Sequence, residues 1–424
     1  MIRRILKLRS IMKNRRLTLS ELELLRRKKL QAVIRNAYDH VPYYRSLFRS
    51  VGLSPEDIRT PQDLEHVPVT TKDDLRAAGT ANVISRWADL STCIPTRTHG
   101  SSGKPFMVYR TPSEHTTLPM LNMASLMAIG FGPRDRLAVL GPDSLKPPGL
   151  HQRWGLYRRE HIPLSTPLSE QISRLIDFRP TLLWSYPSAL RALIHYLDRP
   201  VTSIMHPRIL ITSAEVFDDV LKKRVRSELD ADWYNFYLTH EFGQIAWECT
   251  EHRGLHLNSD QFILECLDNG GPAPIGKQGV TVLTSLYSFA MPLIRYNLGD
   301  LCAYSTDQCG CGCPFPLLEP PTGREHEMLL TPSGKILSPQ RVAHILCGFE
   351  GVDQWRLIQE TRRRFVLKLV MHGQPDHEGL QRIRSQFLEY VDEPVTLDIE
   401  FPDYMDEGAL KFRTFVSNVR SALP

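Results

Sequence analysis

Apolar residues recur at the spacing of an amphipathic helix near the start of the chain. They mark one face of a predicted helix over residues 17–50, namely Leu22, Leu25, Leu30, Val33, Ile34 and Ala37. The segment His40-Val-Pro-Tyr-Tyr44 should interrupt this helix, because the residue before a proline is driven away from helical backbone angles. A further helix is predicted at Thr70-Thr-Lys-Asp-Asp-Leu75, where a threonine before acidic residues is typical of a helix start.

Short apolar runs alternate with amphipathic segments between residues 135 and 229. The runs 136–140, 181–184 and 208–212 predict strands, and the segments 169–177, 188–198 and 216–229 predict helices. Strands that alternate with helices favour a mainly parallel sheet. Ligands of such sheets bind at the carboxyl ends of the strands, which points to the loops after Thr212 and near Tyr237.

The pattern changes again over residues 255–305, where Gly, Pro and short alternating runs predict an antiparallel β section. Beyond a boundary near Gly323-Arg324, two alternating strands and an intervening helix predict a compact α+β unit. We therefore expect an α/β protein with two domains. The large domain spans residues 1–323 and combines a mainly parallel sheet with the β section; the small, mobile α+β domain spans residues 324–424.

The composition limits the classes of protein to consider. Of the 424 residues, 42% are hydrophobic and 23% are charged, which is typical of a soluble globular protein. The net charge of +5 suits an anionic ligand such as ATP, but it is weak support for binding nucleic acid, and no nucleic-acid partner is expected. No apolar run reaches eighteen residues, so no transmembrane segment is expected.

The first residues, MIRRILKLRSIMKNRRL, are basic and scatter their apolar side chains among the charges. A signal peptide needs a continuous apolar segment, which this stretch lacks. Two interpretations stay open for it: a helix that lies on a membrane surface, and a solvated helix that leads into the fold. Without an export signal the expected location is cytoplasmic, where closely spaced cysteines indicate metal binding rather than disulfides.

The segment Thr98-His-Gly-Ser-Ser-Gly-Lys-Pro105 has the residue types of a phosphate-binding loop. Glycines let the backbone approach a ligand and turn its N–H groups toward an anion, and the hydroxyl groups add further donors. The candidate ATP-binding residues are Thr98, Gly100, Ser101, Ser102, Gly103 and Lys104. Only two residues separate the glycines, so this is not a Walker A loop, and by itself the segment is more typical of an ordinary turn.

A second group of residues combines thiols with imidazoles. It comprises Cys249, His252, His256, Cys309, Cys311 and Cys313. Thiolate and imidazole ligands together favour Zn²⁺, and four of them form a closed, structural site. The alternative is a reduced, glycine-rich loop that carries free thiols.

Four other segments, taken in order with the loop at 98–105, carry a family resemblance. They are Ser213-Ala-Glu215, Tyr237-Leu-Thr-His-Glu241, Pro292-Leu-Ile-Arg-Tyr-Asn-Leu-Gly-Asp300 and Gly323-Arg324. Their order and separation resemble the adenylate-forming superfamily. Within it the chain is most similar to the phenylacetate–CoA ligases and the related capsular polysaccharide biosynthesis, or coenzyme F390 synthetase-like, proteins, over about residues 20–418.

The resemblance implies that ATP and Mg²⁺ activate a carboxylic acid to its acyl-AMP, with release of pyrophosphate. The acyl group would then pass to an acceptor, and CoA, a carrier protein and an amine all stay open. A non-catalytic nucleotide-binding homologue and a component of polysaccharide or natural-product assembly are the alternatives. The resemblance leaves a homodimer open.

The resemblance also implies roles for individual residues. The loop at 98–105 would hold the ATP phosphates, Tyr237 would stack near the base and Asp300 would accept hydrogen bonds from the ribose. The remaining nucleotide residues would be Ser213, Ala214, Glu215 and Arg324, the last at the hinge between the domains. The catalytic candidates are Lys411, His240 and Glu241, which would ligate Mg²⁺. The Zn²⁺ ligands would be Cys249, His256, Cys309 and Cys311.

The chain departs from the family pattern at His99, at Leu238 and His240, and at Leu410, which stands before Lys411 where a glycine is usual; these departures leave an altered reaction open. Without the ordered family motifs, Asp300 would be interpreted as a turn residue and Lys411 as a surface charge. Trp184, Tyr186 and Phe236 are candidates for lining the acid pocket, although aromatic residues at such positions are more typical of a core.

Overall fold

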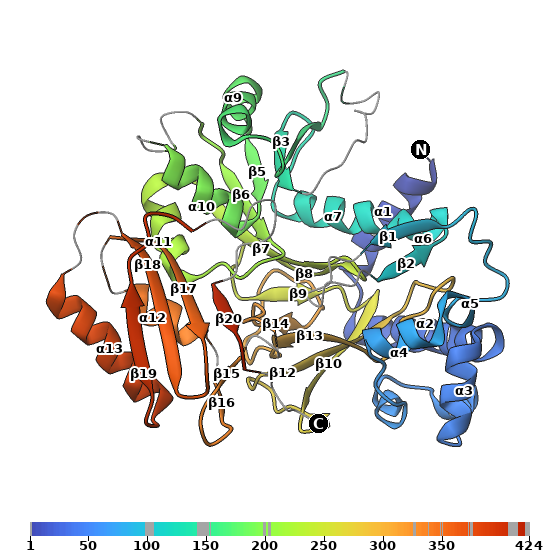
Figure 1. The fold of residues 1–424 in the computed structure, drawn as a ribbon. Helices are drawn as coiled ribbons and strands as arrows, with labels where there is room; N and C mark the ends of the chain where they lie inside the picture. Colours follow the sequence, from blue (N-terminus) through green and yellow to red (C-terminus); the bar gives the residue numbers. More distant parts are fainter. Residues whose placement is uncertain are drawn as a thin grey trace. The chain divides into compact units, whose positions relative to one another are not determined.

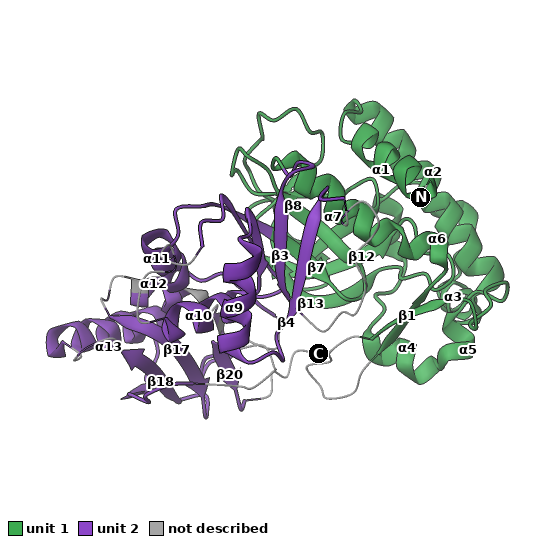
Figure 2. Ribbon diagram, turned by 90° about the horizontal axis from the view of Figure 1, so that it is seen from above, with its two compact units in different colours: residues 1–130, 236–321 green, residues 131–235, 322–424 purple. Residues whose placement is uncertain are grey.

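The structure is a computed structural model of residues 1–424. It describes residues 2–97, 106–141, 152, 154–197, 201, 205–324, 328–337, 339–347, 349, 351–371, 373, 376–405 and 414–419. The chain divides into two compact units, which Figure 2 colours separately: unit 1 holds residues 1–130 and 236–321, and unit 2 holds residues 131–235 and 322–424. Each unit therefore takes two separate stretches of the sequence.

The N-terminal part of unit 1 is helical. Its elements are α1 (Ile2–Asn14), α2 (Leu19–His40), α3 (Pro42–Ser50), the 3-10 turns η1 (Pro55–Asp57) and η2 (Gln62–His66), α4 (Lys72–Ala78), α5 (Thr80–Val83), β1 (Ile94–Arg97), β2 (Met107–Arg110), α6 (Pro112–His115) and α7 (Thr117–Ala128). The helix predicted over residues 17–50 is present and is interrupted at Val41. Thr18 and Glu21 form a capping box at the start of α2.

The second part of unit 1 is antiparallel, as the pattern over residues 255–305 predicted. One group of strands runs in the order β14 (Leu317–Leu318), β9 (Leu255–Leu257), β8 (Gly243–Glu248) and β7 (Asp232–Thr239). A second sheet has the order β11 (Gly271–Pro272), β10 (Phe262–Asp268), β12 (Gly279–Ser285) and β13 (Tyr296–Cys302). Gly279 is required in this sheet, because a Cβ there would lie 2.8 Å from the backbone nitrogen of Leu267.

Unit 2 begins with the predicted alternation of strands and helices. Parallel strands have the order β6 (Ile209–Ser213), β5 (Leu182–Ser185), β3 (Arg136–Gly141) and β4 (Arg158–Pro163). Helices α9 (Leu168–Phe178), α10 (Pro187–Tyr196) and α11 (Asp219–Glu228) connect or follow them and share one apolar core with them. This confirms the predicted α/β fold class.

The rest of unit 2 is a small mixed sheet with helices against it (Figure 1). The strands have the order β19 (Thr396–Glu400), β18 (Arg364–Met371), β17 (Val352–Gln359) and β20 (Phe415–Ser417), next to the hairpin β15 (Leu329–Leu330) and β16 (Ile336–Leu337). Helices α12 (Gln340–Cys347) and α13 (His377–Val391) bury their apolar faces in the same core as this sheet. Among the described residues, no helix has the length and apolar character that a membrane span requires.

Candidate functional site

Two of the predicted site elements lie outside the described residues. The phosphate loop with Thr98, Gly100, Ser101, Ser102, Gly103 and Lys104 is one of them, and Lys411 is the other. Their assignment therefore depends on the sequence alone.

In unit 2, the predicted adenine segment Ser213-Ala-Glu215 begins at Ser213, the last residue of β6. Ala214 has a φ of 68°, a left-handed backbone that is costly for a residue with a side chain. The neighbouring side chains hold this backbone in place. Nε1 of Trp184 donates a hydrogen bond of 2.8 Å to Oγ of Ser213, and the backbone N–H of Ser188 donates one of 2.8 Å to Oε2 of Glu215. Strained backbone held by its neighbours is typical of ligand-binding turns.

Glu215 has a structural partner that sequence reasoning missed. Ser188 lies in the first turn of α10, where backbone N–H groups lack helical acceptors, and its hydroxyl also donates to Oε1 of Glu215 at 2.9 Å. The Glu215 carboxylate thus caps α10 and joins it to the end of β6. Burial, followed by the negative charge of Glu215, raises the pKa of Tyr186 to about 12. No local sequence pattern predicts the contact of Ser188 with Glu215, because the two residues are 27 positions apart.

Arg324, the predicted hinge residue, is half-buried in unit 2. It directly follows Gly323, whose φ of 137° favours glycine at that position.

In unit 1, the structure brings Tyr237 and Asp300 together. The Tyr237 hydroxyl, on β7, donates a hydrogen bond of 2.6 Å to Oδ2 of Asp300 on β13. Both side chains are largely buried, with 7% and 8% of their surface exposed. The backbone before Asp300 turns at Gly299, with a φ of 71°, and Oδ1 of Asn297 accepts the N–H of Gly299 at 2.7 Å. The tyrosine therefore orients the carboxylate that the sequence assigned to the ribose.

His240 and Glu241 lie in the tight connection between β7 and β8, and Leu238 lies near the end of β7; all three are half-buried. The backbone carbonyl of Glu241 accepts a hydrogen bond from Arg110, which is fully buried and also donates to Oγ1 of Thr96 at 3.2 Å. The negative charge of Glu241 adds to burial in raising the pKa of Tyr296 well above its usual value. Sequence reasoning missed Arg110, because an arginine in a short strand shows no sign of being buried.

Arg295, inside the segment that ends at Asp300, has a structural role. Its guanidinium forms a two-pronged ion pair with Glu265, with Nη2 to Oε1 at 2.7 Å, and donates to the backbone carbonyl of Val67 at 2.6 Å. The next residue back, Ile294, donates its N–H to the buried Tyr44 hydroxyl at 3.0 Å. The segment at 40–44, which interrupts the N-terminal helix, and the motif at 292–300 therefore pack against each other inside unit 1.

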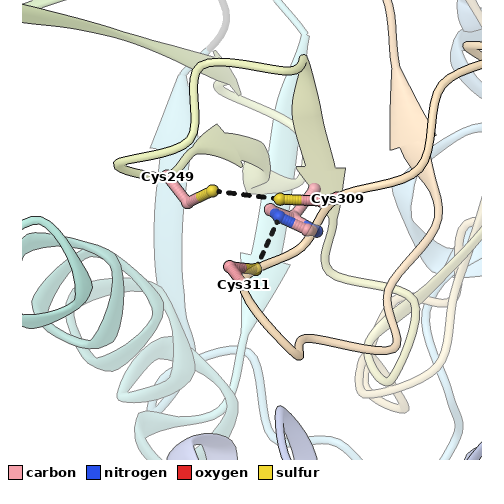
Figure 3. A group of neighbouring side chains, drawn as sticks. Cys249, Cys309 and Cys311 are labelled. Carbon is pink, nitrogen blue, oxygen red and sulfur yellow. Dashed lines mark hydrogen bonds between the residues drawn. The ribbon is translucent and has the colours of Figure 1, made fainter.

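Four cysteine and histidine side chains converge at the edge of the β section (Figure 3). Cys249 follows β8, His256 lies in β9, and Cys309 and Cys311 lie in the loop between β13 and β14. Their ligand atoms all lie within 4.8 Å of one another. Sγ of Cys249 is 3.5 Å from Sγ of Cys309, and Sγ of Cys311 is 3.3 Å from Nε2 of His256.

This geometry fits a tetrahedral Zn²⁺ site. Zinc–sulfur and zinc–nitrogen bonds of ordinary length separate tetrahedral ligand atoms by about 3.5–3.8 Å. Nδ1 of His256 lies 3.1 Å from the backbone oxygen of Phe315, which leaves Nε2 directed at the thiols. Burial lowers the pKa of His256, which favours the neutral imidazole that a metal needs.

The two other candidates from the sequence stand outside this group. Nδ1 of His252 lies 3.1 Å from Oε1 of Glu248. The backbone N–H of Cys313 points at Sγ of Cys311, 3.5 Å away, and burial raises the pKa of the Cys313 thiol to about 12. Among the described residues, the convergent set is the four that the resemblance implied.

Comparisons with known proteins agree with this picture. No family model matches the chain. The chain is 30% identical over 363 residues to a phenylacetate–coenzyme A ligase of Thermus thermophilus, which covers 80% of each protein. It is 28% identical to the ligase of that name from Escherichia coli, over 82% of this chain and 80% of the relative. A solved structure of 2-hydroxyisobutyryl-CoA ligase with a bound acyl adenylate has a TM-score of 0.79 at 19% identity, covering 96% of this chain and 91% of that one.

Proposed function

Because the chain belongs to the phenylacetate–coenzyme A ligase family, we propose that it activates a carboxylic acid with ATP and transfers the acyl group to CoA. A carboxylate oxygen attacks the α-phosphorus of ATP, the bond from that phosphorus to the β-phosphate oxygen breaks, and pyrophosphate leaves. The CoA thiol then attacks the acyl carbon of the adenylate, the bond to the phosphate oxygen breaks, and AMP leaves. The protein is an AMP-forming acid–thiol ligase.

The paired Tyr237 and Asp300 carry the nucleotide assignment. An ionised carboxylate has about four acceptor positions, so Asp300 can accept the Tyr237 hydroxyl and ribose hydroxyls together. Holding the ribose fixes the α-phosphate for in-line attack, which lowers the entropic part of the barrier. We assign Ser213, Ala214 and Glu215 to the adenine for two reasons. They follow the order of motifs in the family, and the left-handed backbone at Ala214 is held in place by hydrogen bonds to its neighbours.

Charge neutralisation is the second requirement, because the acid and the triphosphate are both anions. We assign Glu241 to Mg²⁺, with the loop at 98–105 and Arg324 on the phosphates and Lys411 on the α-phosphate in the transition state. When bound, Mg²⁺ withdraws electron density from the phosphate oxygens. His240, next to Glu241, is the residue of this segment through which the reaction could differ from that of its relatives.

For the acid we propose a small aromatic carboxylic acid, because the named relatives are phenylacetate ligases. Trp184 lies in β5 and contacts Ser213, and Tyr186 lies just after this strand, at the start of α10. Phe236 is fully buried, so we assign it to the core. If the acceptor is a carrier-protein thiol or an amine, acyl transfer to that acceptor will proceed without CoA.

We further propose one structural Zn²⁺ per chain at Cys249, His256, Cys309 and Cys311. The support is the convergence of four donors of the right chemistry within 4.8 Å of one another, with two donor pairs 3.5 and 3.3 Å apart. The ion would tie β8 and β9 to the loop before β14, which has almost no regular structure of its own. A cytoplasmic location and a homodimer stay predictions.

The test is pyrophosphate release from ATP and Mg²⁺ with a panel of aryl and alkyl acids, with and without CoA. The proposal expects release with at least one aromatic acid, AMP formation, and a CoA thioester only when CoA is present. Asp300→Ala is the matched negative variant. Tight ATP binding without pyrophosphate release for any acid would instead indicate a non-catalytic nucleotide-binding homologue.

A further inference from the structure

Helix α1 is fixed to unit 1 by one of its faces. Ile11 is buried, and Leu8 and Met12 pack against the same core. Arg15, just beyond the helix, donates to the backbone oxygen of Ala124 at 2.8 Å, and its guanidinium lies 4.1 Å from the ring centre of Trp247. These contacts hold the helix in place, so its opposite face has a defined direction.

That opposite face is apolar in the first half of the helix and basic in the second half. We call it the outer face of α1 and define it by Ile2, Ile5, Leu6, Arg9 and Lys13, which share one side of a helix through their spacing of three or four residues. Ile2 is 72%, Ile5 43% and Leu6 58% exposed, and Arg9 and Lys13 are exposed as well. Large aliphatic side chains grouped in water are unfavourable and often mark an interaction site.

The stretch of sequence that contains α1 differs in charge from the rest of the chain. Residues 1–29 contain eleven Lys and Arg against two acidic residues, whereas the remaining residues contain 41 against 45. The positive net charge of the chain therefore arises wholly from residues 1–29. Among the described residues, the outer-face Arg9 and Lys13 form no ion pair.

We propose that the outer face of α1 docks the protein on an anionic membrane surface. Ile2, Ile5 and Leu6 enter the boundary between headgroups and acyl chains, and the basic residues lie against lipid phosphates. This is the arrangement of interfacial amphipathic helices. The helix of 13 residues is about 20 Å long, too short to cross the hydrocarbon layer, so it lies on the surface.

The two kinds of side chain together favour a lipid surface over other partners. A nucleic acid would attract the basic residues but would leave Ile2, Ile5 and Leu6 in water, because it offers no apolar layer. A second copy of this helix would cover the apolar residues but would bring like charges together. An anionic bilayer satisfies both at once, since basic residues are attracted to its surface potential and apolar ones to its interior.

The test is flotation of the full-length chain, without any N-terminal extension, on vesicles. We expect binding to vesicles of phosphatidylcholine with about one third phosphatidylglycerol, and much weaker binding to phosphatidylcholine alone. Two double variants separate the contribution of the apolar side chains from that of the basic ones. Ile5→Ser with Leu6→Ser should weaken binding at least about tenfold, and Arg9→Glu with Lys13→Glu at least about twentyfold.

Matched controls come from other exposed positions. Ile275→Ser removes an isoleucine that is 70% exposed, and Arg382→Glu with Arg384→Glu reverses two exposed charges on α13; both should float like the parent. The outer-face side chains are exposed, so acid activation measured without vesicles should be unchanged in every variant. This separates the docking from the proposed function, on which it does not depend.

Three results would overturn the proposal. The parent chain does not float with anionic vesicles; the outer-face variants float as the controls do; or light scattering shows that Ile5→Ser with Leu6→Ser converts a dimer to a monomer while flotation is unaffected. The last result would assign the face to a second copy of the chain. Tight binding of a DNA duplex that is insensitive to the serine variant, with no flotation, would assign the basic residues to nucleic acid.

Discussion

The Tyr237 hydroxyl donates a hydrogen bond of 2.6 Å to Oδ2 of Asp300, across 63 residues of sequence. Tyr237 lies in β7 and Asp300 in β13, so two segments of the family resemblance meet at one buried contact. The aromatic ring and the carboxylate are thereby held at a fixed separation before any nucleotide binds. Preorganisation of this kind lowers the ordering cost of binding.

Asp300→Ala should weaken ATP binding at least about a hundredfold while the fold is retained. Two charged hydrogen bonds to the ribose, each worth about 1.5–3 kcal/mol, would be lost. Tyr237→Phe keeps the ring and removes only the hydroxyl, so it should weaken ATP binding less. Calorimetric titration with ATP measures both, and unchanged affinity in a folded Asp300→Ala protein would contradict the ribose assignment.

Metal analysis of protein purified without a histidine tag should find one zinc per chain. Removing it with a strong chelator should lower the melting temperature, because the ion ties the Cys309–Cys311 loop to β8 and β9. Cys249→Ser should lose the metal, whereas Cys313→Ser should keep it, since Cys313 lies outside the convergent set. Substoichiometric zinc with no loss of stability on chelation would favour free thiols.

Lys411→Ala should slow acyl-AMP formation at least about a hundredfold, on the scale of losing one preorganised electrostatic donor. ATP binding should change little, because this charge acts mainly in the transition state. Thiol transfer from a synthetic acyl-AMP should be largely spared.

The control for this lysine is Lys368→Ala. Lys368 lies on β18, with Nζ 3.1 Å from Oε2 of Glu400, and should be dispensable for adenylation. If Lys411→Ala adenylates at the parental rate, Lys368 and Lys104 become the next candidates, and the family alignment of the C-terminal segment is wrong.

Asp218→Ala should destabilise the protein by about 3–5 kcal/mol, because it leaves a buried guanidinium without its anionic partner. Nη2 of Arg191 lies 2.6 Å from Oδ2 of Asp218, and their side chains are 6% and 1% exposed. Asp218 also caps α11 by accepting the N–H of Leu221 at 2.9 Å.

Its neighbour supplies the control. Asp219 lies on the surface, 3.0 Å from Nζ of Lys222 and 3.5 Å from Nδ1 of His344, and Asp219→Ala should cost about 1 kcal/mol or less. Urea denaturation of the full-length variants measures both changes. Equal free energies of unfolding for the two variants would show that the buried ion pair contributes no more to stability than the surface pair.

Local sequence determined the elements of this protein and the identity of its candidate groups. The alternation of apolar runs and amphipathic segments predicted β3, β5 and β6 with α9, α10 and α11, because each element depends on residues only a few positions apart. The change of pattern after residue 255 predicted the antiparallel β section for the same reason. The ordered motifs predicted the family, which the relatives confirm.

Tertiary structure alone decided which of these groups meet. The contacts of Tyr237 with Asp300, Ser188 with Glu215, and Arg110 with the Glu241 carbonyl join residues 63, 27 and 131 positions apart. Of the six cysteines and histidines in the candidate group, packing of β8, β9 and one loop brings four together and directs His252 to Glu248 instead. Such contacts follow from how whole elements pack around a shared core, and no short window of sequence contains that information.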